Sequence, residues 1–245
     1  MSLLSKLTII IPTFYPGKII VKCLKSLPKE SEIIIVDNGE DIQLLKIIKS
    51  LEIKIKHYKI GDVGLPKSFN YGVKQSKNES ILITQPDVQF EKNSILNLLK
   101  VQKKYPKAGI VSPLVFEKNK YSAYDHLNLK LDKYGKLTYQ NEVNKLNKIP
   151  LDDICVEAVP ATAMLLRKKF INKLKGWDEN IYTYHEDLDI CLRLRKKNFQ
   201  IIKTPRAIVH HVGFGSHSSK NKEKAEQSRN WHYSWSSLYF KQKHA

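Results

Sequence analysis

The residues best suited to chemistry are three closely spaced carboxylates, Glu186, Asp187 and Asp189, within the segment 176–195. Neighbouring carboxylates raise one another's pKa, which suits a general base that takes up and releases a proton near neutral pH. Aromatic residues precede them and apolar residues at helical spacing follow, so we expect the acids to line a pocket where a helix begins. The alternative is structural, because acidic side chains also stabilise the positive end of a helix dipole.

A second group of polar residues follows the predicted strands. Thr13, Asp37, Asn38 and Asp87 come directly after the first, second and fourth apolar, β-branched segments. In open α/β sheets, ligands bind beyond the carboxyl ends of the strands. Each residue alone is explained as well by turn formation. Their shared position favours a binding site.

Alternating strands and helices must position these residues. Apolar, β-branched runs predict strands at 7–11, 32–36, 53–58, 80–84 and 109–116, and helical spacing predicts helices at 18–27, 42–51, 66–75 and 93–104. This order is typical of an α/β fold with a doubly wound, mostly parallel central sheet flanked by helices. Further strands are predicted at 155–160, 163–167, 199–203 and 207–211, with a short helix at 168–174.

Two segments depart from this alternation. The polar stretch 121–151 predicts a hairpin, with short strands near Leu129 and Leu137 and a turn at 133–136, which would be either a substrate wall or a surface excursion. The tail 217–245 is basic and then aromatic. A helix of this composition lies on an anionic membrane surface or packs its aromatic side chains on the core.

Composition narrows the class of protein. The formal net charge of +18 favours an anionic partner, although the abundance of Lys, Ile and Asn is also compatible with codon bias. GxGxxG and GxxxxGK[ST] are both missing, which argues against a dinucleotide-binding Rossmann domain and a P-loop NTPase. Cys23, Cys155 and Cys191 are expected to be buried thiols of a reducing compartment. No apolar segment is long enough for a signal peptide or membrane span, so we expect a cytoplasmic location.

Short motifs in a fixed order complete the pattern. They are Ile11-Pro12-Thr13-Phe14, Val36-Asp37-Asn38-Gly39, Asp62-Val63-Gly64 with Phe69-Asn70-Tyr71-Gly72, Gln85-Pro86-Asp87-Val88, the segment 161–167, Gly176-Trp177-Asp178-Glu179, Glu186-Asp187-Leu188-Asp189 and the segment 211–216. Together they resemble the family-2 glycosyltransferases with a GT-A fold, especially bacterial rhamnosyltransferase-like members. The resemblance implies a GT-A domain over residues 1–216, with a nucleotide-sugar-binding half (1–116) and an acceptor-binding half (117–216), followed by the helical tail 217–245.

The activity that the resemblance implies is inverting transfer of a sugar, with rhamnose as the first guess. The donor would be a nucleotide-diphosphate sugar, and the acceptor a glycan or lipid-linked molecule of bacterial cell-surface polysaccharide synthesis. The implied donor-binding residues are Thr13, Asp37, Asn38, Asp62, Gly64, Asn70, Gln85 and Asp87. Asn70 would equally serve to lock a helix–loop junction.

The resemblance also implies Mn²⁺ or Mg²⁺ bridging the donor phosphates, with Asp87 as a ligand. The family motif is Asp-x-Asp, whereas this chain has Gln85 at the first position. A second protein ligand would therefore help, and the resemblance implies His211 rather than His210, because its spacing to Ser216 is that of the family's C-terminal histidine. Imidazole suits Mn²⁺ better than Mg²⁺. The alternative is a half-buried strand end with one ring packed and one exposed.

The family's Glu-Asp pair makes Asp187 the expected general base, supported by Glu186. The residues expected to bind the acceptor are Trp177, Tyr184 and Asp189. Glu186 and Asp189 would alternatively orient the base or pair with Arg193.

Two other functions remain open. One is a protein that binds nucleic acid or another anionic surface, but no recognition-helix, zinc or ribonucleoprotein motif occurs and the basic residues are dispersed, so no nucleic-acid partner is expected. The other is a catalytically inactive sugar-nucleotide binder, which Gln85 keeps open. Because the tail is basic and aromatic, we also expect a peripheral contact with anionic lipid at the inner face of the cytoplasmic membrane.

Overall fold

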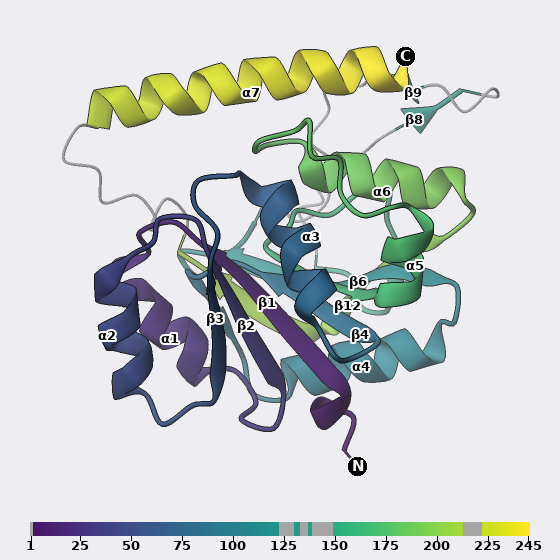
Figure 1. Ribbon diagram of the computed structural model, residues 1–245. Coiled ribbons are helices and arrows are strands. Elements are labelled where there is room, and N and C mark those ends of the chain that lie inside the picture. The colour runs from purple at the N-terminus through teal and green to yellow at the C-terminus, as the bar shows by residue number, and fades with distance from the viewer. Residues whose placement is uncertain (1, 123–129, 133–136, 139–148, 213–221) are drawn as a thin grey trace.

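The computed structural model describes residues 2–122, 130–132, 137–138, 149–212 and 222–245 (Figure 1). One sheet contains β1 (Leu7–Thr13), β2 (Glu32–Asp37), β3 (Ile55–Lys59), β4 (Ser80–Thr84), β5 (Val88–Phe90), β6 (Ala108–Glu117), β7 (Lys120–Tyr121), β10 (Ile154–Cys155), β11 (Ala163–Arg167) and β12 (Gln200–His211). Its strand order is β10-β12-β6-β11-β4-β1-β2-β3, with β5 paired to β12 and β7 to β6.

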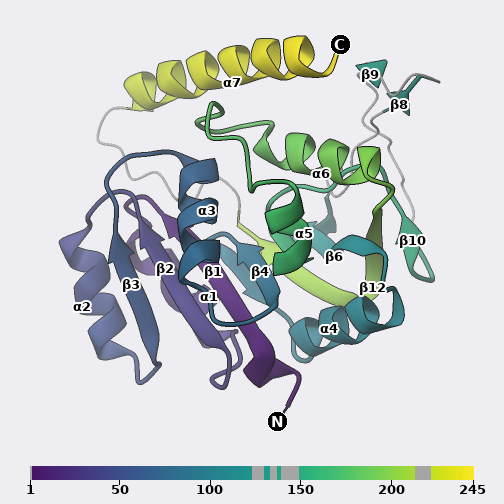
Figure 2. The ribbon, with the colours of Figure 1, turned by 45° about the vertical axis from the view of Figure 1, so that its right-hand side comes forward.

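Helices cover both faces of this sheet (Figure 2). They are the 3₁₀ turns η1 (Leu4–Lys6) and η2 (Gly17–Ile19), then α1 (Ile20–Lys25), α2 (Ile42–Ser50), α3 (Leu65–Gln75), α4 (Ser94–Lys104), α5 (Lys168–Lys173), α6 (Glu186–Lys196) and α7 (Lys222–His244). Side chains alternate along β1, so Ile9 and Ile11 pack with α1, α2 and α4, whereas Ile10 packs with α3, α5 and α6. This alternation produces the two cores that hold the layers together.

The four strands β4-β1-β2-β3 are parallel, as predicted. Their carboxyl ends therefore meet at one edge of the sheet, which we call the carboxyl edge. In the ladder between β1 and β2, Thr13 is the partner of Asp37. Thr13 and Asp37 are thus neighbours at this edge.

The parallel direction does not extend through the whole sheet. β11 is antiparallel to both of its neighbours, β4 and β6, while β12 is parallel to β6. An apolar run of residues carries no information on strand direction, and the long stretch before β11 lets the chain return from the opposite edge. The sheet is therefore mixed. Its parallel pairs lie within β4-β1-β2-β3 and between β12 and β6.

Two predicted strands, 199–203 and 207–211, form the single strand β12. Its register shifts between Thr204 and Ile208, where Pro205 cannot donate a ladder hydrogen bond. The irregularity explains why the sequence shows an interruption. The predicted strand 155–160 is reduced to β10, which ends at Cys155.

Burial of the cysteines differs from expectation at one position. Cys23 and Cys191 are buried, as predicted, and burial raises the pKa of Cys23 to about 12. Cys155 is exposed, so the prediction of a buried thiol was wrong there. The cause is its place on the short edge strand β10, which pairs with β12 alone.

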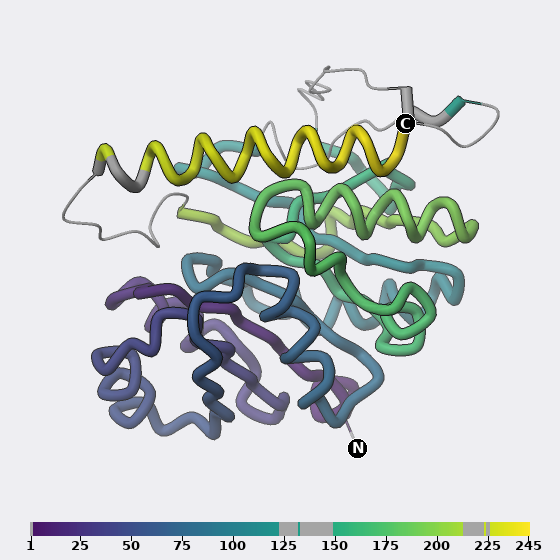
Figure 3. The backbone as a smooth tube through the Cα atoms, turned by 45° about the horizontal axis from the view of Figure 1, so that its top comes forward, coloured from purple at the N-terminus to yellow at the C-terminus, as the bar shows by residue number. Residues whose placement is uncertain are grey.

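A hairpin of two short strands and the helix α7 lie outside the main sheet (Figure 1). β8 (Lys130–Leu131) and β9 (Leu137–Thr138) pair as antiparallel strands, which confirms the predicted hairpin, while Leu129 and its turn at 133–136 lie outside the described residues. Helix α7 lies across the carboxyl edge, above α3 and α6 (Figures 1 and 3). Among the helices in the described ranges, none is both long and apolar enough to cross a membrane.

Candidate active site

The first part of the site lies where β1 and β2 end. Thr13 Oγ1 donates a hydrogen bond of 3.4 Å to Asp37 Oδ1, and the backbone N–H of Asn38 donates to Thr13 O at 2.8 Å. All three side chains are buried. The structure therefore brings together the three residues that the sequence places at these strand ends.

Asp37 makes further contacts that the sequence did not predict. The N–H groups of Gly39 and Asp41 donate to its carboxylate at 3.1 and 3.0 Å, and His57 Nε2 lies 3.1 Å from its Oδ2. His57 lies on β3, where its register partner on β2 is Ile35, two residues before Asp37. Both carboxylate oxygens of Asp37 are engaged, so Asp37 orders the turn that follows β2.

Asn38 connects this group to the start of α3. Ser68 Oγ donates to Asn38 Oδ1 at 2.8 Å and to Gly64 O at 2.6 Å. Gly64 has a φ of +84°, and a Cβ at this position would lie 2.5 Å from Tyr182 O. Leu65 N donates to the same carbonyl oxygen at 2.8 Å. Glycine at 64 therefore allows the segment before α6 to approach α3.

Asp62 lies next to this junction and is exposed. It accepts a short hydrogen bond from the hydroxyl of Tyr182, whose ring stacks on His232 of α7 with centroids 4.2 Å apart. Asp62 is thus connected to α7 through Tyr182. No local sequence pattern indicates this connection, because the three residues are distant along the chain.

Asn70 connects α3 to the segment before α6. Its Oδ1 accepts from Trp177 N at 2.8 Å, and its Nδ2 donates to Trp177 O and Glu179 Oε1, both at 2.9 Å. The amide is fully used in these bonds. Of the two expectations for Asn70, the geometry matches the lock of a helix–loop junction.

The second part of the site pairs Asp87 with His211. The Nε2 atom of His211 lies 3.5 Å from Asp87 Oδ2, and its Nδ1 lies 3.4 Å from Glu117 Oε1. His210 turns the other way and lies 2.8 Å from Glu91. The preference for His211 over His210 as the partner of Asp87 therefore agrees with the geometry, and Glu117 is an acid that the sequence did not single out.

The Asp87 and His211 side chains suit a hard divalent cation that takes its other ligands from phosphate oxygens and water. Burial opposes protonation of His211, but the adjoining carboxylates of Asp87 and Glu117 outweigh it and raise the pKa of the imidazole. A cation would have to displace this proton. In the parts of the chain that the structure describes, no group of three or more His, Cys, Asp or Glu residues has the geometry of a metal site. Gln85, two residues before Asp87, is partly buried, and its backbone carbonyl oxygen accepts from Cys23 Sγ at 3.5 Å.

The third part contains the paired carboxylates at the start of α6. Glu186 is buried, and its Oε2 has no hydrogen-bond partner among the residues that the structure describes. Asp187 is partly exposed, and its carboxylate accepts from Leu188 N at 2.8 Å and Ala161 N at 3.3 Å. Burial and the charge of Asp187 raise the pKa of Glu186 to about 8, and burial raises the pKa of Asp187.

The contact with Ala161 places Asp187 near the other parts of the site. β11 starts at Ala163, which pairs with Thr84 at the end of β4, and Thr84 Oγ1 donates to Thr162 O at 2.9 Å. Asp87 follows three residues after Thr84. The paired carboxylates and the Asp87–His211 pair thus belong to the same stretch of the carboxyl edge.

The backbone before α6 is unusual. Tyr184 and His185 have φ values of +65° and +62°, in a region that residues other than glycine rarely adopt. Such conformations cost about 1–3 kcal/mol each and persist where surrounding contacts enforce them. Here the rings of Tyr184 and His185 contact Tyr233 of α7, and His185 also stacks on Phe240. Helix α7 therefore helps to hold the segment that presents Glu186 and Asp187.

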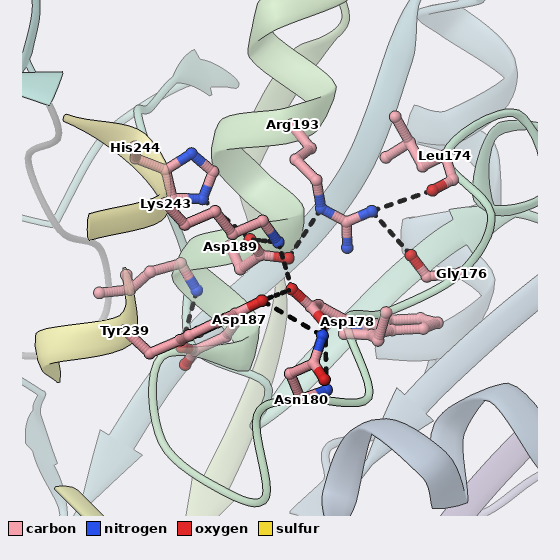
Figure 4. A network of polar contacts seen from close by, with 12 residues as sticks. Leu174, Gly176, Asp178, Asn180, Asp187, Asp189, Arg193, Tyr239, Lys243 and His244 are labelled. Atoms are coloured by element: carbon pink, nitrogen blue, oxygen red, sulfur yellow. Dashed lines mark hydrogen bonds and ion pairs between the residues drawn. The ribbon is translucent and has the colours of Figure 1, made fainter. Parts of the chain in front are cut away.

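Asp189 and Trp177, which we expected to bind the acceptor, are both enclosed. Asp189 has no exposed surface, and it contacts Arg193 at 2.7 Å, Lys243 at 2.6 Å and His244 at 2.9 Å (Figure 4). Trp177 is also buried, with its ring against Phe69. Their burial corrects the expectation of direct acceptor contact, whereas the alternative pairing of Asp189 with Arg193 is confirmed. Tyr184 is half-buried and stays a candidate.

The same network attaches α7 to the segment before α6. Asp178 accepts from Tyr239 at 2.9 Å and from Lys243 at 2.6 Å (Figure 4). Ser236 Oγ donates to Thr183 O at 2.7 Å. These bonds connect one face of α7 to both ends of the segment 178–189. The sequence did not predict them, because the tail has no single apolar stripe that identifies its inner face.

Comparisons with known proteins find several glycosyltransferases. Rhamnosyltransferase WbbL of Escherichia coli is 24% identical over 230 residues, covering 77% of this chain and 85% of the relative. A glycosyltransferase of Methanococcus voltae, a dolichyl N-acetylglucosaminyl phosphate diacetamido-dideoxyglucuronosyltransferase, is 32% identical over 124 residues, 44% of this chain and 39% of the relative. This chain thus spans about two fifths of that protein.

Solved structures show the same fold at low sequence identity. GalNAc-T7 with UDP, GalNAc and Mn²⁺ superposes with a TM-score of 0.64 at 14% identity, covering 88% of this chain and 45% of that one. The Pyrobaculum calidifontis mannosyltransferase PcManGT with GDP-Man and Mn²⁺ gives a TM-score of 0.64 at 13% identity, covering 92% and 60%. The fold is therefore GT-A, as the resemblance implied. Residues 8–174, more than half of the chain, match the glycosyl transferase family 2, and the chain belongs to this family.

Proposed function

We propose that the protein is an inverting glycosyltransferase that moves a sugar from a nucleotide-diphosphate donor to a hydroxyl of a glycan or lipid-linked acceptor. The observation that carries this proposal is the position of Asp187. Its partly exposed carboxylate lies at the start of α6 against Ala161, beside the strand end that leads to Asp87 and His211. A base and a phosphate-binding pair at one edge of a sheet are what transfer from a nucleotide sugar requires.

The donor would bind along the carboxyl edge. Thr13, Asp37 and Asn38 would shape the pocket for the nucleoside, with Asp37 acting through the turn that it orders. Asp62, Gly64 and Gln85 would line the sugar and phosphates. The division into a donor half, 1–116, and an acceptor half, 117–216, remains part of this proposal.

Asp87 and His211 would hold Mn²⁺ or Mg²⁺, which neutralises charge on the departing diphosphate when bound. PcManGT and GalNAc-T7 were both solved with Mn²⁺. Because Gln85 replaces a second carboxylate, His211 carries more of the binding here than it would beside two acids. The imidazole favours Mn²⁺.

Asp187 would take the proton from the acceptor hydroxyl. The acceptor oxygen forms its bond to the anomeric carbon as the bond from that carbon to the diphosphate oxygen breaks, so the configuration is inverted in a single displacement. Glu186 lies beside Asp187, and burial and the charge of Asp187 raise the pKa of Glu186 to about 8, so Asp187 is the first member of the pair to ionise. This suits a base that works near neutral pH.

The choice of sugar and acceptor rests on the names of the relatives. WbbL is named a rhamnosyltransferase, and a Mycobacterium tuberculosis relative, 23% identical over 54% of this chain and 46% of the relative, is named an N-acetylglucosaminyl-diphospho-decaprenol L-rhamnosyltransferase. Rhamnose is accordingly our first choice of sugar. The acceptor would be a lipid-linked precursor of a bacterial surface polysaccharide, and the enzyme would work in the cytoplasm.

A thermal-shift panel tests the proposal. UDP, dTDP, GDP and CDP are each added with and without Mn²⁺, and a ligand that binds the folded state raises Tm by mass action. We expect one nucleotide to act selectively and in a metal-dependent manner. No shift with any of them would contradict the proposal, and a shift without any turnover of the matching sugar donor would instead indicate an inactive sugar-nucleotide binder.

A further inference from the structure

Helix α7 has two faces with different roles. Ser236, Phe240 and His244 recur at every fourth residue and are buried against the segment 178–189 and α6. This inner face accounts for the attachment of the helix to the rest of the molecule. Large apolar residues on the opposite side of the helix are exposed.

The outer face carries Trp231, Trp235 and Leu238, which are 69%, 52% and 66% exposed. Their spacing of four and three residues places them in one stripe along the helix. Isolated exposed apolar side chains are common on proteins, but a stripe with two tryptophans marks an interaction surface. We call this stripe the outer face of α7.

Charge indicates which partner fits the outer face. The chain has a formal net charge of +18, so two copies meeting through this helix would repel one another, whereas an anionic surface would attract it. Lys241 is exposed one turn beyond Leu238. Tryptophan has a large apolar ring with a single N–H donor, and it prefers the boundary between lipid headgroups and acyl chains. The combination is typical of a helix that lies flat on a membrane.

We propose that the outer face of α7 docks the protein on an anionic lipid bilayer, with Trp231, Trp235 and Leu238 inserted at the headgroup level. The inner face of the same helix holds the segment that presents Glu186 and Asp187, and α7 lies across the carboxyl edge (Figures 1 and 3). A docked helix therefore brings the candidate base close to the bilayer surface. The use of this position for a lipid-linked acceptor rests on the proposed function, whereas docking itself does not.

Tryptophan fluorescence tests the docking directly. The chain has three tryptophans, and Trp177 is buried, so a change on adding vesicles reports on Trp231 and Trp235. With vesicles of equal parts phosphatidylglycerol and phosphatidylcholine, we expect a shift of emission to shorter wavelength and co-sedimentation of the protein. Both should weaken in high salt and with phosphatidylcholine alone, because the attraction is partly electrostatic.

The double variant Trp231→Ser with Trp235→Ser should lose the emission shift and bind these vesicles at least about tenfold more weakly, because the inserted rings supply much of the affinity. Ile42→Ser and Leu151→Ser are matched controls, since these side chains are 68% and 95% exposed but lie elsewhere, and both should bind as the unaltered protein does. Equal binding by the double variant would overturn the proposal. So would light scattering that shows a dimer of the unaltered protein which the double variant loses.

The two proposals fail in different ways. Vesicle binding needs neither nucleotide nor metal. If the nucleotides give no thermal shift but the vesicles still bind through Trp231 and Trp235, the transferase proposal fails and the docking surface stands. The opposite result removes the docking surface and leaves the transferase proposal in place.

Discussion

His211 ends β12 and Asp87 follows β4, yet Nε2 of His211 lies 3.5 Å from Oδ2 of Asp87. The short strand β5 explains this proximity, because it follows Asp87 directly and pairs with the end of β12, where His211 is the partner of Val88. The sheet therefore holds a carboxylate and an imidazole together at its carboxyl edge. A metal-dependent nucleotide site is expected to depend on both.

Removing either member of this pair should abolish the metal-dependent part of nucleotide binding. For Asp87→Asn and His211→Ala, we expect the Mn²⁺-dependent rise in Tm with the preferred nucleotide to disappear, which corresponds to a loss of affinity of tenfold or more. His210→Ala is the matched control, because His210 pairs with Glu91 instead. If His210→Ala had the same effect as His211→Ala, the assignment of the ligand would be wrong.

Replacing the candidate base should slow turnover without weakening the binding of the sugar donor. Asp187→Asn keeps the shape of the side chain and its place beside Ala161, but the amide takes up no proton from the acceptor. We expect kcat to fall by about 10²–10⁴-fold, with the nucleotide-dependent Tm shift unchanged. A variant that retains most of the transferase rate would show that the base lies elsewhere.

Glu186 should make stability depend on pH. Its pKa rises from 4.5 to about 8 on folding, so the folded state favours the neutral acid and loses stability as the pH rises from 4.5 through about 8. Glu186→Gln removes this loss. The free energy of unfolding of the variant should therefore exceed that of the unaltered protein by about 1 kcal/mol or more at alkaline pH, and the difference should shrink towards acid pH.

Urea unfolding at pH values below, within and above this window measures the effect. In the same variant the pKa of Asp187 should stay raised, because burial is its cause, so the acid limb of kcat/KM is expected to keep its position. A difference in stability that is independent of pH would contradict the assignment of the raised pKa to Glu186.

The sequence predicted the polar strand ends well and the tail poorly, for physical reasons. Thr13 and Asp37 follow strands whose apolar runs are unambiguous, and parallel neighbours necessarily end at the same edge. His211 was singled out by the family resemblance, and the structure places it beside Asp87. The direction of β11 was not, because apolar residues buried on both faces look the same in either direction.

The error at Asp189 has a similar origin. A carboxylate in the first turn of a helix is equally compatible with ligand binding and with a buried ion pair, and only the position of α7 decides between them. Helix α7 carries apolar residues on both faces, so its sequence does not tell which face packs inward. The partners Lys243 and His244 come from the far end of the chain, beyond any local pattern.

Asp189 should consequently matter for stability. Burial disfavours its charge, but the hydrogen bond from His244 and the charges of Arg193 and Lys243 outweigh this effect and lower its pKa. Asp189→Asn leaves Arg193 without its counter-charge and Lys243 with Asp178 alone, and we expect about 3 kcal/mol of destabilisation by urea unfolding. Asp152→Asn is the control, because Asp152 is 85% exposed and should change stability by less than about 0.5 kcal/mol. Equal effects would mean that the buried network does not stabilise the fold.

Gly64 provides the sharpest test of how the segment before α6 approaches α3. A Cβ at this position would lie 2.5 Å from Tyr182 O and 2.8 Å from the Tyr182 ring, and the φ of +84° is itself unfavourable for alanine. Gly64→Ala must therefore move Tyr182, which also holds Asp62 and stacks on His232. We expect destabilisation of about 2–4 kcal/mol and weaker nucleotide binding.

Gly17→Ala separates the effect of a positive φ from the effect of the close contact with Tyr182. Gly17 also has a positive φ, +60°, but a Cβ there would have nothing within 4 Å. It should lose only about 1 kcal/mol, from the backbone conformation alone, and keep its nucleotide-dependent Tm shift. The excess loss in Gly64→Ala then measures the contact with Tyr182. If the two variants were equally destabilised, backbone conformation would account for both, and the close approach of Tyr182 to α3 would not contribute to stability or to the site.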